Sequence, residues 1–423
     1  MPTAPASEWL ISVDSHLIEP ANVWSSRLPA KHRDAGPRWV TDGDDETWLF
    51  EGSKRIPLDA MGSGGAIWPK EDRPPMFTPL TWDQVSPSCY DPKARIEAMD
   101  RDHELAAMCF PNMAGFAGSL FQRAQDKDLA LLCIQAYNDW FLDEWVAAYP
   151  GRFIGLGIVP LWDGRLAAAE AERVIAKGAR ALSISQAPEK IGFPAITDEH
   201  WDPLYSVMND ARLPLCMHLG TGIPPAQEDA GADFAKKMRD AIKNNDLDSL
   251  AERMGIKKAD AARRRKMLPG TSTSLIGATM GRDTLTDWLD SELFQQYPNL
   301  KLALSENGVG WIPSVLSLAD WTETLNRLAE PADGPLPSDI FREHIYGCFI
   351  DEPITPELLK VLGTDNIMIE TDFPHTATNW PHSMDRVDVC LQGIPDESRR
   401  KILRGNAERV FSFTPADPPV LAG

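Results

Sequence analysis

The stretch LISVDSH, residues 10–16, is a short apolar run that ends in ionisable side chains. Its apolar positions are continuous more than alternating, as expected for a strand of a parallel sheet covered on both faces. Asp14 and His16 are two residues apart, so on a strand their side chains point to the same face. The stretch therefore predicts a buried strand whose C-terminal end carries two candidate metal ligands.

Seven more runs of this kind follow, each bounded by turn or polar residues. They are AAMCFPN (106–112), FIGLGIVPL (153–161), ALSIS (181–185), LPLCMHL (213–219), LKLALSE (300–306), HIYGCFI (344–350) and NIMIETD (366–372). Helical patterns fill many of the gaps, and alternation of strand and helix is typical of parallel βα units. Eight units predict an α/β fold, a (β/α)8 TIM barrel. A doubly wound open sheet is the main alternative.

Four segments between these runs have the pattern of helices. Residues 91–104 and 163–177 each begin at an aspartate that could cap a helix, and 126–149 has apolar positions at three- and four-residue spacing. Residues 356–362 predict a short helix before the last strand.

Two stretches do not fit simple βα units and predict insertions after strands one and five. Residues 21–90 are rich in Pro, Gly and Trp, whereas 223–270 are charged with a helical pattern. Loops that follow barrel strands build the active-site face, so both insertions are candidates to cover the site. The alternative is peripheral decoration or dimer contacts. We expect residues 1–423 to form a single domain, because barrels of this length are common.

Composition narrows the function classes. A net charge of −20 disfavours nucleic acid, whose phosphates require a basic surface. No segment is apolar for the roughly 18 residues that a membrane helix needs, and the N-terminus does not resemble a signal peptide. The cysteines are scattered, which predicts buried thiols in a cytoplasmic protein. They are Cys89, Cys109, Cys133, Cys216, Cys348 and Cys390.

Ionisable side chains recur at the C-terminal ends of the predicted strands. Besides Asp14 and His16 on strand one, they are His218 on strand five, Glu306 on strand six and Asp372 on strand eight. Any one of them has an ordinary structural explanation, such as a helix cap or a turn. Together they lie on one face of a barrel, and imidazole with carboxylate suits Zn²⁺ or Mn²⁺. The pattern predicts a metal site.

Four segments resemble the amidohydrolase superfamily. They are DSHLIEP (14–20), MHLGTG (217–222), LSENGVGWIP (304–313) and ETDFPH (370–375). They are most similar to the amidohydrolase-2 branch, which holds aminocarboxymuconate-semialdehyde, γ-resorcylate and 5-carboxyvanillate decarboxylases. The resemblance extends from Val13 to about Arg409.

The resemblance implies one divalent ion, Zn²⁺ in preference to Mn²⁺, held by Asp14, His16, His218 and Asp372. Two positions depart from the family pattern. Asp14 stands where the family has His or Glu, and is a shorter but competent ligand. Glu306 stands at the strand-six position that is usually His, so the decarboxylases that use that His as an acid or base do not map cleanly.

Further candidates lie near these positions. His375 follows Asp372 by three residues and is a candidate for substrate contact or a surface loop residue. Glu19 is either a neighbour of the metal ligands or a cap of the turn at Pro20. Two tryptophans, Trp311 and Trp380, are candidates for the wall of an aromatic pocket or for simple packing.

Two mechanisms fit one metal ion. A non-oxidative decarboxylase of an aromatic or unsaturated carboxylic acid, favoured by the resemblance, would use Glu306 or Asp372 as the acid that protonates carbon. A hydrolase would use metal-activated water, with Asp372 accepting the proton. The third alternative is a barrel that only binds a ligand. We expect a small carboxylic acid as substrate, and a homodimer as among the relatives.

Overall fold

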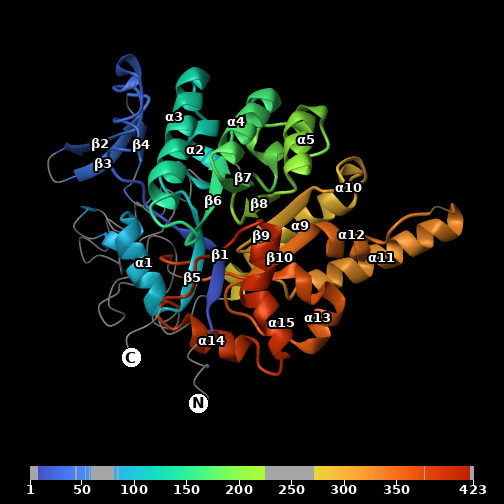
Figure 1. Cartoon of the computed structure of the whole chain (residues 1–423). Helices are drawn as coiled ribbons and strands as arrows, with labels where there is room; N and C mark the ends of the chain where they lie inside the picture. The colour runs from blue at the N-terminus through green and yellow to red at the C-terminus, as the bar shows by residue number, and fades with distance from the viewer. Residues whose placement is uncertain are drawn as a thin grey trace, which may run out of the picture.

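Eight parallel strands form the centre of the computed structural model, which describes residues 8–42, 45–52, 54–56, 58, 81–82, 85–223, 271–331, 333–375 and 377–419. The strands are neighbours in chain order, so each βα unit adds the next strand of the barrel (Figure 1). They are β1 (Leu10–His16), β5 (Glu104–Phe110), β6 (Phe153–Ile158), β7 (Ala179–Ile184), β8 (Pro214–His218), β9 (Lys301–Ser305), β10 (Ile345–Phe349) and β11 (Ile367–Ile369).

The first and last strands meet, which closes the sheet into a barrel. Two backbone hydrogen bonds join them beyond the end of β11: Asp372 N–H donates to the Asp14 carbonyl at 2.9 Å, and His16 N–H to the Phe373 carbonyl at 2.8 Å. The Thr371 N–H donates to the Ser12 hydroxyl at 2.9 Å. The predicted (β/α)8 barrel is confirmed, and the open sheet is wrong.

All eight predicted runs overlap a strand, and all strands except β1 end before their runs do. Strand β9 ends at Ser305 and β11 at Ile369, so Glu306 and Asp372 follow their strands. Both residues have a left-handed backbone, with φ of 59° and 54°. That conformation is uncommon for residues other than glycine, and it takes each chain out of the strand direction at the barrel mouth.

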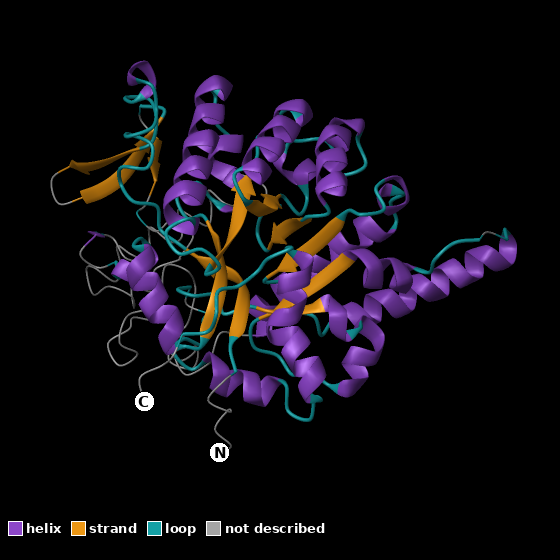
Figure 2. Cartoon of the chain, viewed as in Figure 1, coloured by secondary structure: helices purple, strands orange, loops and turns teal. Residues whose placement is uncertain are grey.

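Helices cover the outside of the barrel (Figure 2). They are α1 (Pro92–Arg101), α2 (Ser119–Gln122), α3 (Lys127–Trp140), α4 (Gly164–Ala176), α5 (Asp202–Ala211), α9 (Thr271–Leu289), α10 (Leu293–Gln296), α11 (Ile312–Ala329), α12 (Pro337–His344), α13 (Pro356–Leu362), α14 (Ser383–Cys390), α15 (Asp396–Arg400) and α16 (Asn406–Val410).

The four predicted helices are present, and two of them begin after the expected aspartates, Asp91 and Asp163, while Asp126 caps a third. The side chains of Asp91, Asp126 and Asp163 accept backbone N–H groups of the first turns of α1, α3 and α4. Two C-terminal bounds were wrong. Helix α1 ends at Arg101 because Glu104 already begins β5, and α3 passes at Phe141 into a π-helical turn.

Part of the stretch 21–90 forms a second, antiparallel sheet. Its strands are β2 (Arg38–Asp42), β3 (Asp45–Phe50) and β4 (Lys54–Ile56). The buried Trp48 of β3 packs against Trp24, with ring centroids 5.4 Å apart, and the Trp24 indole N–H donates to the Cys133 carbonyl of α3. This sheet therefore packs on the flank of the barrel beside α3 (Figure 1).

The remaining expectations concern the second insertion, the cysteines and membrane-spanning helices. Residues 224–270, almost all of the second predicted insertion, lie outside the described residues. The six cysteines are buried and form no disulfide bond, as predicted. Among the helices that the structure describes, none has the length and apolar character needed to cross a membrane.

Glu104 lies in the barrel seam, where its carboxylate accepts the Thr371 hydroxyl at 3.2 Å. Burial raises the pKa of Glu104 from 4.5 to about 8, and the charge of Asp102 adds to the rise. The folded state thus holds this proton more tightly than the unfolded state. The stability that the proton contributes is complete below about pH 4.5, the unfolded value, and is lost as the pH rises through about 8.

The free energy of unfolding of wild type should fall as the pH rises from about 5 to about 8. We expect Glu104→Gln to make this fall smaller, by a few kcal/mol at most. Urea unfolding at several pH values measures this, with Glu357→Gln on the exposed surface of α13 as the control. Equal pH slopes in wild type and Glu104→Gln would show that Glu104 does not hold this proton.

Candidate metal centre

Six ionisable side chains gather at the C-terminal mouth of the barrel. Strand β1 supplies Asp14 and His16, because alternate residues of a strand share a face. Strand β8 supplies His218 at its last residue, and Glu306 follows β9 directly. The segment after β11 supplies the remaining pair, Asp372 and His375.

Short distances connect these side chains. His16 Nε2 is 2.7 Å from Asp372 Oδ1 and 3.6 Å from Asp14 Oδ1. His218 Nε2 is 3.2 Å from Asp14 Oδ2 and 3.7 Å from Glu306 Oε2. His375 Nδ1 is 3.2 Å from Asp372 Oδ2. The structure thus brings together all six residues predicted from the sequence.

The ligand atoms form two adjacent groups. Asp14, His16 and His218 offer atoms within 4.8 Å of one another, and so do Glu306, Asp372 and His375. The four predicted ligands are therefore divided, with Asp372 in the second group. The 2.7 Å contact between His16 and Asp372 joins the two groups.

Several of these atoms are buried without a hydrogen-bond partner: both carboxylate oxygens of Asp14, Nε2 of His218 and Oδ2 of Asp372. Buried polar atoms are normally paired, because an unpaired one loses its interactions with water. His218 Nδ1 lies 2.7 Å from the Leu219 carbonyl, to which it can donate. That bond leaves a lone pair on Nε2, the arrangement of metal-binding histidines. The donor set fits a divalent cation.

Burial and neighbouring charges separate the two aspartates. Burial raises the pKa of Asp14 well above its ordinary range, and the charge of Asp372 adds to the rise. Burial also acts to raise the pKa of Asp372, but His375 and His16 outweigh it and hold the pKa below the ordinary value. Asp372 is therefore the anionic member of the pair, and a bound cation would favour the charged form of both.

Burial also keeps His16 and His218 neutral. Burial lowers the pKa of His16 to about 4, although its hydrogen bond with Asp372 acts in the opposite direction. Burial also lowers the pKa of His218, against the charge of Glu306. Neutral imidazole is the form that binds metal ions.

Glu306 and His375 are the members of the cluster that reach toward solvent, with 19% and 21% of their side chains exposed. Burial raises the pKa of Glu306 to about 7, and the charge of Asp372 adds to the rise. The Glu306 N–H donates to both carboxylate oxygens of Glu370, at 3.1 and 3.2 Å. Glu370 thus holds the backbone of Glu306 in its left-handed conformation. Glu370 was not among the predicted residues, although it precedes Asp372 by two positions in the run 366–372, where alternate residues of a strand would share a face.

Aromatic rings form one side of the site. The centroid of Phe116 lies 3.9 Å from that of His218, and the centroid of Phe110 lies 4.8 Å from it. The carboxylate of Glu19 accepts the backbone N–H groups of Met113 and Ala114, at 2.7 and 3.1 Å, in the loop that carries Phe116. Glu19 therefore fixes this loop, whereas its sequence position had suggested a neighbour of the metal ligands or a cap of the turn at Pro20.

The two predicted tryptophans and His344 have structural contacts. The indole N–H of Trp311 donates to the Asn307 carbonyl, and that of Trp380 to the Ala98 carbonyl. His344 is buried against Phe294.

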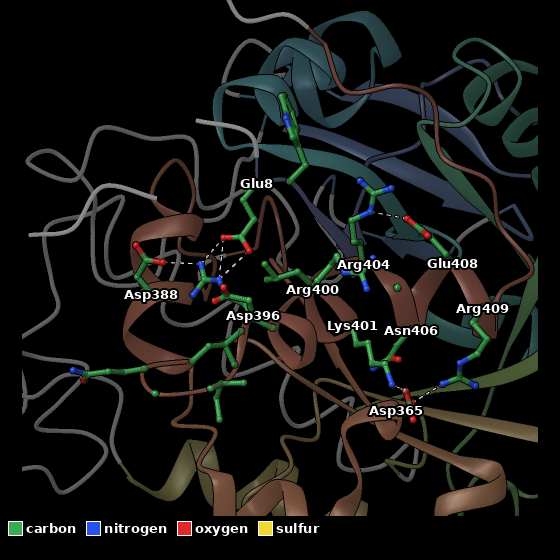
Figure 3. Close-up of a pocket in the computed structure, with 18 residues that line it drawn as sticks. Glu8, Asp365, Asp388, Asp396, Arg400, Lys401, Arg404, Asn406, Glu408 and Arg409 are labelled. Atoms are coloured by element: carbon green, nitrogen blue, oxygen red, sulfur yellow. Dashed lines mark hydrogen bonds and ion pairs between the residues drawn. The ribbon is translucent and has the colours of Figure 1, made fainter. Parts of the chain in front are cut away.

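A cavity of about 1090 Å³ lies at the opposite end of the barrel, where residues preceding β1 and β11 meet α15 and α16 (Figure 3). Most of its charged side chains pair with one another. Arg399 contacts Glu8 and Asp388, Lys401 contacts Asp365, and Arg404 contacts Glu408. Active sites of such barrels lie at the C-terminal face, so this cavity is not the candidate site.

Known proteins resemble this chain in sequence and in fold. Residues 47–413 match the family model described as amidohydrolase, a match that begins after Asp14 and His16. A γ-resorcylate decarboxylase from Polaromonas sp. (strain JS666) is 27% identical over 295 residues, which cover 65% of this chain and 75% of that protein.

Solved structures share the fold. An amidohydrolase from Mycobacterium avium subsp. paratuberculosis has a TM-score of 0.66 at 20% identity, over 96% of this chain and 100% of that one. A 5-carboxyvanillate decarboxylase from Novosphingobium aromaticivorans has a TM-score of 0.60 at 16% identity, and the match covers 96% of this chain and 97% of that one. The latter structure contains manganese and 3-methoxy-4-hydroxy-5-nitrobenzoic acid.

Proposed function

Because this chain belongs to the amidohydrolase family, we propose that it is a metal-dependent, non-oxidative decarboxylase of an aromatic or unsaturated carboxylic acid. The observation that carries the proposal is the group of buried carboxylate and imidazole atoms at the barrel mouth that have no hydrogen-bond partner. The name of the γ-resorcylate decarboxylase relative supports the reaction.

We propose that Asp14, His16, His218 and Asp372 hold one divalent ion. Two imidazoles and two carboxylates suit Zn²⁺, with Mn²⁺ as the alternative that the manganese-containing neighbour supports. When bound, such an ion would supply positive charge for the substrate's carboxylate and an adjacent oxygen. The protein supplies this position with buried side chains whose orientation is fixed before the substrate enters.

Glu306 is the proposed acid. Its carboxyl group lies between His218 and the solvent-facing mouth, where it can meet a ring carbon of a bound substrate. The proton on its carboxyl oxygen forms a new C–H bond, the bond from that carbon to the carboxylate then breaks, and CO2 leaves. Solvent returns the proton to Glu306, so atoms and charges balance. Glu370 holds the Glu306 backbone during this exchange.

The substrate class follows from the walls of the site. The rings of Phe110 and Phe116 beside His218 offer flat apolar surface to an aromatic or conjugated acid.

Hydrolysis is the second candidate. Asp372 is ionised and lies 3.2 Å from His375, so this pair could accept a proton from a water molecule.

The test is to incubate the metal-loaded protein with hydroxybenzoates, including γ-resorcylate and 5-carboxyvanillate, and with a panel of amides, esters and lactones. We expect CO2 release and a product that lacks the carboxyl group. Hydrolysis of an ester, amide or lactone without release of CO2 would show that the protein is a hydrolase rather than a decarboxylase. Binding without turnover of any panel member would instead favour a ligand-binding barrel.

Three further features belong to the proposal. We propose that residues 1–423 form one domain with insertions at 21–90 and 223–270, and that the protein acts as a homodimer. We also propose a cytoplasmic location, which six buried thiols without a disulfide bond support.

A further inference from the structure

Helix α11 carries four large apolar side chains that face solvent. They are Leu318, Trp321, Leu325 and Leu328, with 67%, 60%, 46% and 78% of their surfaces exposed. We call these four residues the α11 stripe. Their spacing of three, four and three residues places them on one side of the helix, as at the contact positions of paired helices. Scattered apolar residues are ordinary on a surface, but a continuous stripe marks an interaction site.

The stripe faces away from the barrel. The buried residues of α11 are Ile312 and Leu316, in its first half. At about 100° per residue, Leu318 lies about 200° around the helix from Leu316. The second half of α11 has no buried residue and extends away from the barrel (Figures 1 and 2). A free helical segment of this length is marginal in water without a packing partner.

Charge is separated from the stripe. The three charged residues of α11 are Asp320, Glu323 and Arg327, and all lie on the other side of the helix. Arg327 pairs with Glu323 at 2.7 Å, and Asp320 accepts the Ser338 N–H at 2.8 Å. The positions that flank the stripe are uncharged, as at Thr322 and Thr324. Two copies of this surface therefore meet without like charges, although each chain carries a net charge of −20.

The stripe is complementary to itself. Its spacing reads the same in both directions about position 323, so an antiparallel copy places Trp321 opposite Leu325 and Leu318 opposite Leu328. A twofold dimer requires this property, because both partners present the same surface. We propose that α11 packs antiparallel against α11 of a second copy of this chain, with the stripe as the apolar centre of the dimer interface.

A membrane surface fits the stripe less well. Helices that lie on membranes are rich in Lys and Arg on their polar face, whereas α11 has one Arg and two acidic residues.

The experiment measures molecular mass by light scattering and sedimentation over a range of protein concentrations. Wild type should have twice the 46.9 kDa mass of one chain. Trp321→Glu and Leu325→Glu bury charge at the interface, and each should weaken the dimer by at least about 100-fold. Val389→Glu, on α14, adds the same charge at another apolar residue that is 60% exposed, and should remain dimeric.

Disulfide trapping tests the orientation without a destabilising charge. The native cysteines are buried, so new thiols on α11 should react with each other. Under mild oxidation, a mixture of Trp321→Cys and Leu325→Cys proteins should form a disulfide between the two variants. A wild-type monomer at all concentrations, dimers that survive both Glu substitutions, or absence of the mixed disulfide would each overturn the proposal. A monomer that binds lipid vesicles through α11 would overturn it in favour of a membrane.

Discussion

Asp372→Asn is expected to lower kcat for decarboxylation by about 10³-fold or more and to weaken metal binding. The side chain is fully buried, contacts His16 at 2.7 Å and His375 at 3.2 Å, and leaves one oxygen without a hydrogen-bond partner. Asparagine keeps the shape but removes the negative charge that a divalent cation requires at this position. Steady-state kinetics together with elemental analysis of the purified variant measure both effects.

The chain offers a matched control for this substitution. Asp385 also pairs with a histidine three residues away, His382, at 3.5 Å, but its side chain is 83% exposed. Asp385→Asn should therefore leave kcat and metal content unchanged. If Asp372→Asn retained both its metal and its turnover, Asp372 would have neither role, and the ion would have to be held by the group of Asp14, His16 and His218.

Glu306→Gln is expected to lower kcat by about 10²-fold or more while the metal content stays at the wild-type level. Glutamine keeps the size and the hydrogen-bonding shape, and the backbone bond from residue 306 to Glu370 is unaffected by the substitution. The loss should therefore report the missing proton rather than a displaced loop. Glu357→Gln on the surface is the control for handling and assay.

The outcome of Glu306→Gln also assigns the proton to a residue. Normal turnover of the variant would contradict the role of Glu306 and pass the acid function to Asp372 or His375. Loss of metal in the variant would show that Glu306 is a ligand, and the site would then extend across both groups of ligand atoms.

The sequence was sufficient for the barrel and for the set of ionisable side chains that meet at its mouth. Parallel strands covered on both faces leave continuous apolar runs, and each of the eight runs overlaps a strand. The ligand candidates could be predicted because strand alternation fixes the direction of Asp14 and His16, and barrel topology brings strand ends together.

The sequence was not sufficient for contacts between distant segments. Glu370 supports Glu306 across 64 residues of chain, and Glu19 fixes a loop more than 90 residues away. Phe116 lies in a loop without any strand pattern, so its position beside His218 depends on how that loop folds. The left-handed backbone of Glu306 and Asp372 is likewise set by surrounding hydrogen bonds rather than by a local glycine.

The central claim is that a divalent ion at the barrel mouth is required for decarboxylation. The direct measurement is CO2 release by protein that has been stripped of metal with a chelator and then titrated with Mn²⁺ or Zn²⁺, using a carboxylic acid that the substrate panel has identified. Activity should be lost on stripping, and should return to a plateau at about one ion per chain. Full activity in the metal-free protein, with elemental analysis showing no ion present, would contradict the account.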